Sequence, residues 1–400
     1  MSAAQTNSTF DLRRLQQIAL IVGVVFLVIL GIGAFVNPAQ FFRSYLFSYI
    51  FWLGMPLGCL ALLMLQHLTG GGWGMVIRRP LEAATRTLPL MLILFVPIVI
   101  GMHSLYPWTH AEEAAELAKL GKTRYLNTPF FIGRALLFFV IWFLLAYFLN
   151  RWSREQDRTG DRRLVKYMRV LSGPGMVLFV LTVTFAAVDW VMSLEPHWMS
   201  TMFGFLFVAA WSVSGLAFVI AMTAVLAKHT ALGEITGKSH FHDLGKLLLA
   251  LVMLWTYFAF SQYLIIWSGN LPEEIVYYLP RTAGAWGAIA VFVAILHFAL
   301  PFLALLSRST KRDPNKLVII AVLILMMRLI DFFWMVTPSF TKERFPTGLW
   351  EIVLNLAAPL GLGGLWFAAY LWQLGKMPLI AINDPRYEYT LEQAHAHSGH

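Results

Sequence analysis

The chain has 400 residues, of which 58% are hydrophobic and only 13% are charged, and its mean hydropathy is +0.67. These values exclude a soluble globular domain and indicate an integral membrane protein. The net charge of +9 comes from basic residues that flank apolar runs, without a separate basic and aromatic segment, so no nucleic-acid partner is expected. The single cysteine, Cys59, excludes a disulfide framework, an iron–sulfur cluster and a thiolate zinc site built by this chain alone.

Ten apolar runs follow one another along the chain, each close to the length of about 20 residues that a helix needs to span a bilayer. Glycine, proline and asparagine punctuate the connections between them. The sequence therefore predicts an all-α integral membrane protein of ten transmembrane helices, with residues 1–400 forming a single membrane domain. The runs lie at residues 16–36, 45–68, 87–106, 129–149, 174–192, 199–227, 245–268, 282–306, 316–336 and 349–374.

Lysine and arginine are distributed unevenly over the two sides that these helices define. The side that carries both termini has 21 of them, and the opposite side has 7. By the positive-inside rule, the N-terminal segment 1–15 and the tail 375–400 are expected to be cytoplasmic. The longest cytoplasmic loop, 150–171, is rich in charges and is expected to contact anionic lipid.

Two segments outside the spans have recognisable patterns. The outer loop 107–128 predicts a short surface helix, with Thr109 and Glu112 as a capping box and Gly121 at its end. The end of the tail predicts a disordered segment, and its histidines are not expected to bind metal because they have no closed ligand geometry. These histidines are His395, His397 and His400.

The stretch 182–204 places several polar groups between two apolar helices. The fifth helix carries Asp189 near its end, and the chain turns through Glu195 and His197 before the sixth helix begins. An ionisable residue inside a membrane is costly and is therefore a candidate functional residue, although an acid near the interface can also reach headgroup water. We expect Asp189 to pair with His197 and to exchange a proton near neutral pH, so all three residues are candidates for proton transfer.

A weak internal repeat relates two of the predicted helices. In both the fifth and the ninth helix an aspartate, Asp189 or Asp331, is followed by a proline seven residues later. This spacing predicts two parallel four-helix units, residues 44–192 and 199–336, with the first and tenth helices outside them.

Other polar residues within the predicted helices have several interpretations. Arg328 and Asp331 stand three residues apart on one helix face and are expected to form a structural ion pair. His103 and His297 are further proton-transfer candidates, but they fall at different depths, which argues against a bis-histidine haem. No metal site is predicted, because the bundle helices carry no Glu-x-x-His pair.

The seventh helix is unusually polar for a helix that faces lipid. It carries Gln262 and Tyr263 within an otherwise apolar run. Such side chains can line a hydrated path or a pocket for a ring-shaped ligand. Alternatively, they supply the hydrogen bonds that commonly join helices within membranes.

Two stretches of the sequence carry a specific resemblance to a known family. They are VDWVMSLEPHWMST (residues 188–201) and YIFWLGMPLGCLALLMLQHLTGGG (residues 49–72). The chain resembles, over essentially its whole length, the smaller polysulfide-reductase-like membrane subunit of bacterial alternative complex III. That complex oxidises quinol and reduces cytochrome c or another periplasmic acceptor.

The resemblance implies ten helices in two four-helix bundles and a place in the bacterial inner membrane. The implied partners are a larger paralogous membrane subunit, an iron–sulfur protein and multihaem cytochrome c subunits, so haem and iron–sulfur clusters are expected on those chains. Asp189 and His197 would correspond to the acid and histidine on the quinol side. Glu195, His103, His297, Tyr263 and Gln262 are the other candidates for a quinone site.

Two classes of function remain open. The first is a subunit of a respiratory or photosynthetic quinol-oxidising complex that has no redox centre of its own, is not catalytic alone, and contributes scaffold, quinone binding and proton transfer. The alternative is a secondary transporter, which is typically built from inverted repeats with broken helices at the midplane. The segment Gly54–Gly58, which contains Pro56, leaves a broken second helix open.

Overall fold

The computed structural model describes residues 11–395, and all regular secondary structure in this range is helical. Ten helical spans within it are long and apolar enough to cross a membrane, which confirms the predicted number and identifies a multi-pass membrane protein. The spans are formed by α1 (Leu12–Val36), α2 (Pro38–Thr69), α3 (Gly72–Thr85) with α4 (Leu88–Ile93) and α5 (Val96–Ile100), α8 (Thr128–Thr159), α9 (Arg163–Trp190), α10 (Met202–His229), α12 (Lys238–Gly269), α15 (Gly284–Val293) with η4 (Ala294–Ala299) and α16 (Leu300–Leu306), α18 (Pro314–Val336) and α20 (Leu349–Leu374).

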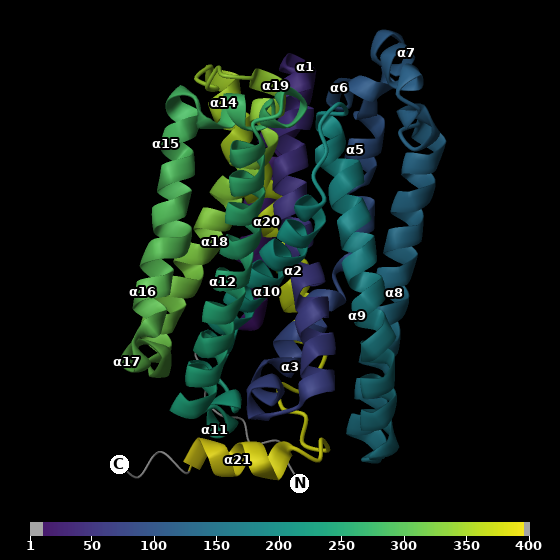
Figure 1. The fold of residues 1–400 in the computed structure, drawn as a ribbon. Coiled ribbons are helices and arrows are strands. Elements are labelled where there is room, and N and C mark those ends of the chain that lie inside the picture. Colours follow the sequence, from purple (N-terminus) through teal and green to yellow (C-terminus); the bar gives the residue numbers. More distant parts are fainter. Residues whose placement is uncertain (1–10, 396–400) are drawn as a thin grey trace.

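Short helices lie in the connections at the two ends of the bundle (Figure 1). We call these ends the α7 end, which also carries α14 and α19, and the α21 end, which also carries α11 and α17. The connecting helices are α6 (Met102–Leu105), η1 (Pro107–Thr109), α7 (Ala111–Lys119), η2 (Lys122–Arg124), η3 (Met192–Leu194), α11 (Leu232–Ile235), α13 (Pro272–Ile275), α14 (Tyr278–Thr282), α17 (Arg308–Arg312), α19 (Pro338–Thr341) and α21 (Tyr387–His395).

Helices α2 and α10 form the centre of the bundle, and both are buried along most of their length. Their backbones touch at two glycines: a Cβ atom on Gly58 would lie 1.9 Å from the carbonyl oxygen of Trp211, and one on Gly215 would lie 2.6 Å from the carbonyl carbon of Gly58. Small residues permit such close packing, which drives helix association inside membranes. Helix α1 packs against α20, which also contacts α2, and α8 packs against α9.

Prolines lie in both the second and the third span, but only the third span is divided into shorter helices. Helix α2 runs without a break from Pro38 to Thr69 although Pro56 lies inside it. The third span begins at Gly72, not at residue 87, and is divided into α3, α4 and α5. Pro89 and Pro97 stand at the first turns of α4 and α5, where the missing N–H group of proline costs no helical hydrogen bond.

A buried cluster of charges joins the C-terminal segment to the bundle at the α21 end. Arg78 of α3 donates to Glu82 through Nε (2.9 Å) and to Asp384 through Nη1. Asp384 also accepts two hydrogen bonds from the guanidinium of Arg386 (2.9 and 2.7 Å), which in turn donates to Gln66 of α2 (3.1 Å). Because Arg78 and Asp384 are both almost fully buried, each of these charges depends on its partners for stabilisation.

Arg79 extends this cluster to α8. It donates to Glu82 (2.7 Å), to Ser153 (3.0 Å) and to both carboxylate oxygens of Asp157 (2.5 and 2.7 Å). The cluster thus balances three arginines with three carboxylates. The sequence placed Arg78 and Arg79 in a loop; they are helical and buried because their partners come from α8 and from the C-terminal segment.

The two predicted patterns outside the spans have different outcomes. The surface helix in the outer loop is confirmed as α7, but the capping box is wrong, because His110 is the residue before the helix and Thr109 donates to the carbonyl of Tyr106 (2.7 Å). The disordered tail is wrong at His395, which ends α21. His397 and His400 lie outside the described residues.

Candidate functional site

The turn between α9 and α10 directs its polar side chains to separate partners. Asp189, fully buried near the end of α9, binds Arg134 of α8 in a bidentate ion pair with N–O distances of 2.7 and 2.9 Å. The guanidinium of Arg134 also lies 3.8 Å from the ring centroid of Tyr125 and donates to its carbonyl (3.0 Å). The expected pair between Asp189 and His197 is therefore wrong: a guanidinium, which is always charged, satisfies the carboxylate.

Glu195 and His197, the other predicted residues of this turn, have partners of their own. The carboxylate of Glu195 lies 2.8 Å from Arg281 and accepts a hydrogen bond from Ser339 (2.7 Å). His197 is exposed, and its Nε2 lies 2.6 Å from a carboxylate oxygen of Glu113 on α7. The sequence suggested that the polar side chains of this turn act together. They form three separate interactions: Asp189 with Arg134, Glu195 with Arg281, and His197 with Glu113.

Two arginines at the α7 end share an unusual environment. Arg281, fully buried, lies 3.6 Å from the ring centroid of Tyr277 and donates to the carbonyl of the same residue (2.6 Å), just as Arg134 does with Tyr125. Arg281 also donates to the carbonyl of Met335 (2.9 Å) on α18. The two halves of the chain therefore repeat an arginine stacked on a tyrosine.

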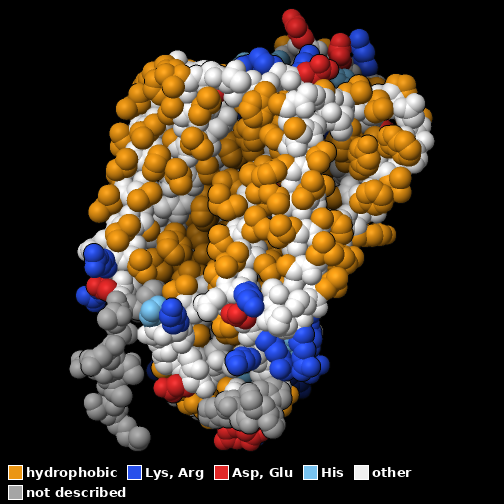
Figure 2. Space-filling model, turned by 90° about the vertical axis from the view of Figure 1, so that its left-hand side faces the viewer, with side chains coloured by type: hydrophobic (Ala, Val, Ile, Leu, Met, Phe, Trp, Pro, Cys, Tyr) orange, Lys and Arg blue, Asp and Glu red, His pale blue; other side chains and the backbone are white. Residues whose placement is uncertain are grey.

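A large cavity opens on the side of the bundle that Figure 2 shows, where hydrophobic side chains surround a hollow. Its volume is about 800 Å³, and α10, α12, α14, α15, η4 and α18 line it. Apolar and aromatic side chains make up most of the lining, and several residues of its rim, such as Tyr257 and Val291, are exposed on the outer face of the bundle. The size and lining are typical of a site for a small apolar ligand.

The polar groups of the cavity are held in a fixed arrangement. Gln262 is 3% exposed; it accepts a hydrogen bond from Ser200 (3.0 Å) and donates to the hydroxyl of Tyr278 (3.0 Å). Burial raises the pKa of Tyr278 to about 12, so its phenol stays protonated. The ring of Tyr263 stands edge-on to that of Tyr278, with centroids 5.2 Å apart. Both predictions for the seventh helix are compatible with this arrangement, because Gln262 joins helices and also lines the cavity.

The predicted ion pair lies at the inner wall of this cavity. Arg328 donates to Asp331 at 2.7 Å, which confirms the pairing, and Asp331 lines the cavity. The ring of Trp255, which also lines the cavity, has its centroid 5.2 Å from the guanidinium carbon of Arg328. His297 of the π-helical segment η4 contacts this ring, with the two ring centroids 4.1 Å apart. Neither ring nitrogen of His297 has a hydrogen-bond partner among the described residues, and the same holds for Nε and Nη2 of Arg328.

His103 takes no part in the cavity. It is exposed in α6 at the α7 end, where its ring centroid lies 4.3 Å from that of His110. His297 is fully buried within the eighth span, whose helices α15 and α16 lie on the left of Figure 1, whereas α6 lies right of centre. The structure therefore brings Tyr263, Gln262 and Asp331 together around the cavity and leaves His103 apart from them.

Several residues of these sites were not identified from the sequence. Arg134 carried a signal, because a cation inside a predicted membrane helix needs a partner. Arg281 and Tyr278 lay in a predicted loop, and nothing in the sequence indicated a role for either residue. Comparisons with protein-family models and with curated proteins find no match to this chain.

Proposed function

We propose that the protein is a membrane subunit of a quinol:cytochrome c, or other periplasmic acceptor, oxidoreductase complex. It contributes scaffold, quinone binding and proton transfer, and it has no redox centre of its own. The observation that carries this proposal is the cavity of about 800 Å³ that opens on the apolar flank of the bundle. The sequence resemblance supports the same complex.

A quinone fits the chemistry of this cavity. Quinones dissolve in the hydrocarbon of the bilayer, so a site for them must open sideways to lipid and accept a flat ring with two oxygens. Aromatic rings such as those of Trp255 and Tyr278 offer faces for the headgroup. Tyr278 and Gln262 offer hydrogen-bonding groups, and the exposed rim gives room for an isoprenoid tail.

Proton transfer is assigned to the groups at the inner wall. Oxidation of a quinol releases protons, and Asp331 is the carboxylate that lines the cavity. His297 and Arg328 continue the polar path behind it. Their unpartnered nitrogens are fully buried, and buried polar groups are normally satisfied by protein or by ordered water. A π-helical segment such as η4 is frequent at functional sites.

The repeated arginine–tyrosine contacts support two four-helix units over residues 44–192 and 199–336. The distribution of Lys and Arg supports cytoplasmic termini, which places the α7 end in the periplasm. Labelling by an impermeant reagent of a cysteine introduced at Thr159 tests this orientation: modification in intact cells contradicts it.

Co-purification tests the complex. The chain is expected to leave the membrane in mild detergent together with an iron–sulfur protein, multihaem cytochrome c subunits and a larger paralogous membrane subunit. The alternative, a secondary transporter, is expected to purify alone. The unbroken α2 and its backbone contact with α10 favour the first outcome, since transporters place broken helices at a central site.

The cavity is tested by a pair of substitutions in α15. Ala290 lines the cavity, whereas Ala288 is exposed on the same helix outside it. Ala290→Phe is expected to reduce quinone retention and the quinol oxidation rate per haem at least tenfold, because the added ring occupies the headgroup space. Ala288→Phe is expected to leave both unchanged. Retained quinone is measured by solvent extraction and chromatography of the purified complex.

Equal quinone retention and turnover in the two variants would show that the cavity is not the quinone site. Thermal stability, measured alongside, separates a blocked site from a disturbed fold.

A further inference from the structure

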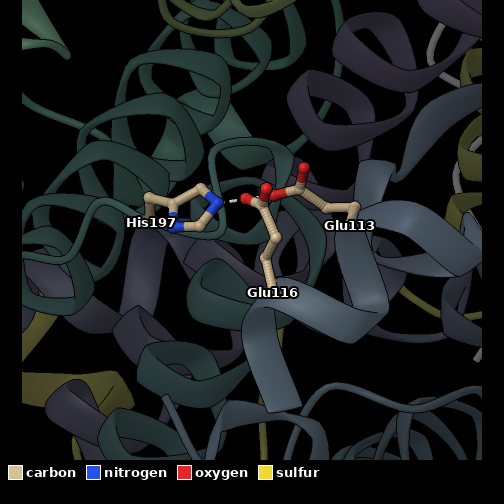
Figure 3. Close-up of side chains that lie close together, drawn as sticks. All are labelled: Glu113, Glu116 and His197. Atoms are coloured by element: carbon tan, nitrogen blue, oxygen red, sulfur yellow. Dashed lines mark hydrogen bonds and ion pairs between the residues drawn. The ribbon is translucent and has the colours of Figure 1, made fainter. Parts of the chain in front are cut away.

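A second group of chemically reactive side chains lies at the α7 end, apart from the cavity. Glu113 and Glu116 stand three residues apart on one face of α7, and His197 extends from the turn between α9 and α10 (Figure 3). The candidate ligand atoms of the three residues all lie within 4.8 Å of one another, and His197 Nε2 lies 2.6 Å from Glu113 Oε1. Three potential metal ligands thus converge from segments that are distant in sequence.

The spacing of these atoms suits a small divalent cation. Zinc binds histidine nitrogen and carboxylate oxygen at about 2.0 to 2.2 Å in tetrahedral geometry, which places neighbouring ligand atoms roughly 3.4 Å apart. The distance of 2.6 Å between His197 Nε2 and Glu113 Oε1 is shorter than this value, and all the ligand atoms lie within 4.8 Å of one another. Small rotations of the side chains are enough to reach it, with a fourth position left for water.

The backbones that carry the ligands are already held in place. His197 is exposed between two buried neighbours, Pro196 and Trp198, and the ring of Trp198 stacks on Tyr277 with centroids 4.0 Å apart. Lys122, just after α7, donates to the carbonyl of Pro196 at 2.8 Å. The turn and the loop that follows α7 are therefore fastened together, so cation binding does not require either segment to fold.

The charge of the group also favours a cation. Two carboxylates on adjacent turns of one helix repel each other, and among the described residues no lysine or arginine forms an ion pair with Glu113 or Glu116. One imidazole nitrogen and two carboxylate oxygens form a ligand set that suits zinc and related first-row divalent ions, whereas calcium requires six or more oxygens.

We propose that Glu113, Glu116 and His197 form a binding site for a zinc-class divalent cation that fastens α7 to the turn between α9 and α10. The same turn carries Glu195, which binds Arg281, and Trp198, which stacks on Tyr277 at the edge of the cavity. Cation binding therefore rigidifies the α7 end next to the cavity. This site is independent of the quinone proposal, since none of its three ligands lines the cavity.

Zinc titration of the full-length chain tests the proposal. The protein is purified without a polyhistidine tag, treated with a chelator and titrated with zinc chloride in a calorimeter. We expect the wild type to bind zinc with micromolar affinity, and His197→Ala and Glu116→Gln to weaken binding at least tenfold. Glu112→Gln, a neighbouring exposed position outside the group, is the matched control and is expected to bind as the wild type does. The tail histidines are present in every variant and contribute the same background.

Hydrogen exchange provides the second measurement. Zinc is expected to slow amide exchange in residues 111–119 of the wild type and to leave that of His197→Ala unchanged. Absence of zinc binding at about 100 μM, equal binding by His197→Ala, or binding without any change in exchange overturns the proposal. All the substituted positions are on the surface or half-buried, and unchanged melting in the presence of chelator verifies that the variants are folded.

Discussion

Asp189→Asn is expected to destabilise the protein by about 3 kcal/mol or more, because it leaves the guanidinium of Arg134 without a counter-charge. The two side chains form a bidentate pair, with Asp189 fully buried and Arg134 only 15% exposed. Removal of one partner of such a pair costs more than removal of both, since an isolated buried charge is worse than an apolar contact. The expected observation is a lower melting temperature in detergent and less assembled complex.

The double variant Asp189→Leu/Arg134→Met is the control for this prediction. It removes both charges and is expected to recover most of the lost stability, as apolar replacements of buried ion pairs often do.

Asp331→Asn is the matched comparison: it leaves Arg328 unpaired in the same way, but it also alters the cavity, so it is expected to lower both stability and quinol turnover. Normal stability with reduced proton release in Asp189→Asn would instead assign Asp189 a role in proton transfer.

Asp384→Asn is expected to release the C-terminal segment from the bundle. Asp384 binds Arg78 and Arg386 within the buried cluster at the α21 end, so its loss leaves the three arginines of the cluster with only two carboxylates, Glu82 and Asp157. A loss of about 3 kcal/mol or more is expected. Limited proteolysis of the segment after α20 measures the release, and Glu388→Gln, which removes an exposed carboxylate from α21, is expected to leave the cleavage rate unchanged.

The same carboxylate sets the pH dependence of this attachment. Burial by itself would raise the pKa of Asp384, but the hydrogen bond from Arg386 and the charges of Arg78 and Arg386 outweigh burial and lower the pKa to about 2. Stability from a lowered pKa is fully present above the unfolded value of about 3.9 and is lost as the pH falls through about 2. The segment is therefore expected to stay protected at neutral pH and down to about pH 4, and to become cleavable between pH 4 and 2 by an acid-stable protease. Release that begins near pH 6 would contradict this assignment.

The transmembrane spans could be predicted from the sequence because bilayer thickness imposes a length on every apolar helix. The start of the third span could not, because Arg78, Arg79 and Glu82 have the composition of a loop. They are tolerated in α3 by partners far along the chain, Asp157 and Asp384. Local sequence carries no information about such pairing.

In the candidate site, too, some contacts could be predicted from the sequence and others could not. Arg328 and Asp331 are three residues apart on one helix, so their pairing follows from helical geometry alone. The partner of Asp189 depends on how α8 rotates against α9, and the sequence fixes no rotation. The polarity of Gln262 and Tyr263 indicated a pocket or an interhelical bond, but the shape of the cavity is set by five other helices.

The π-helical segment η4 has a consequence for how the eighth span tolerates changes in length. A π-turn accommodates one residue more than an α-helical turn, and each residue rotates a helix by about 100°. Deletion of one residue from Ala294–Ala299 would remove the wide turn and change which side chain stands at the position of His297, while α15 and α16 would keep their relative orientation and the span would still cross the membrane. A single insertion or deletion in the eighth span would thus change which side chains lie next to the cavity. The number and the order of the helices would stay the same.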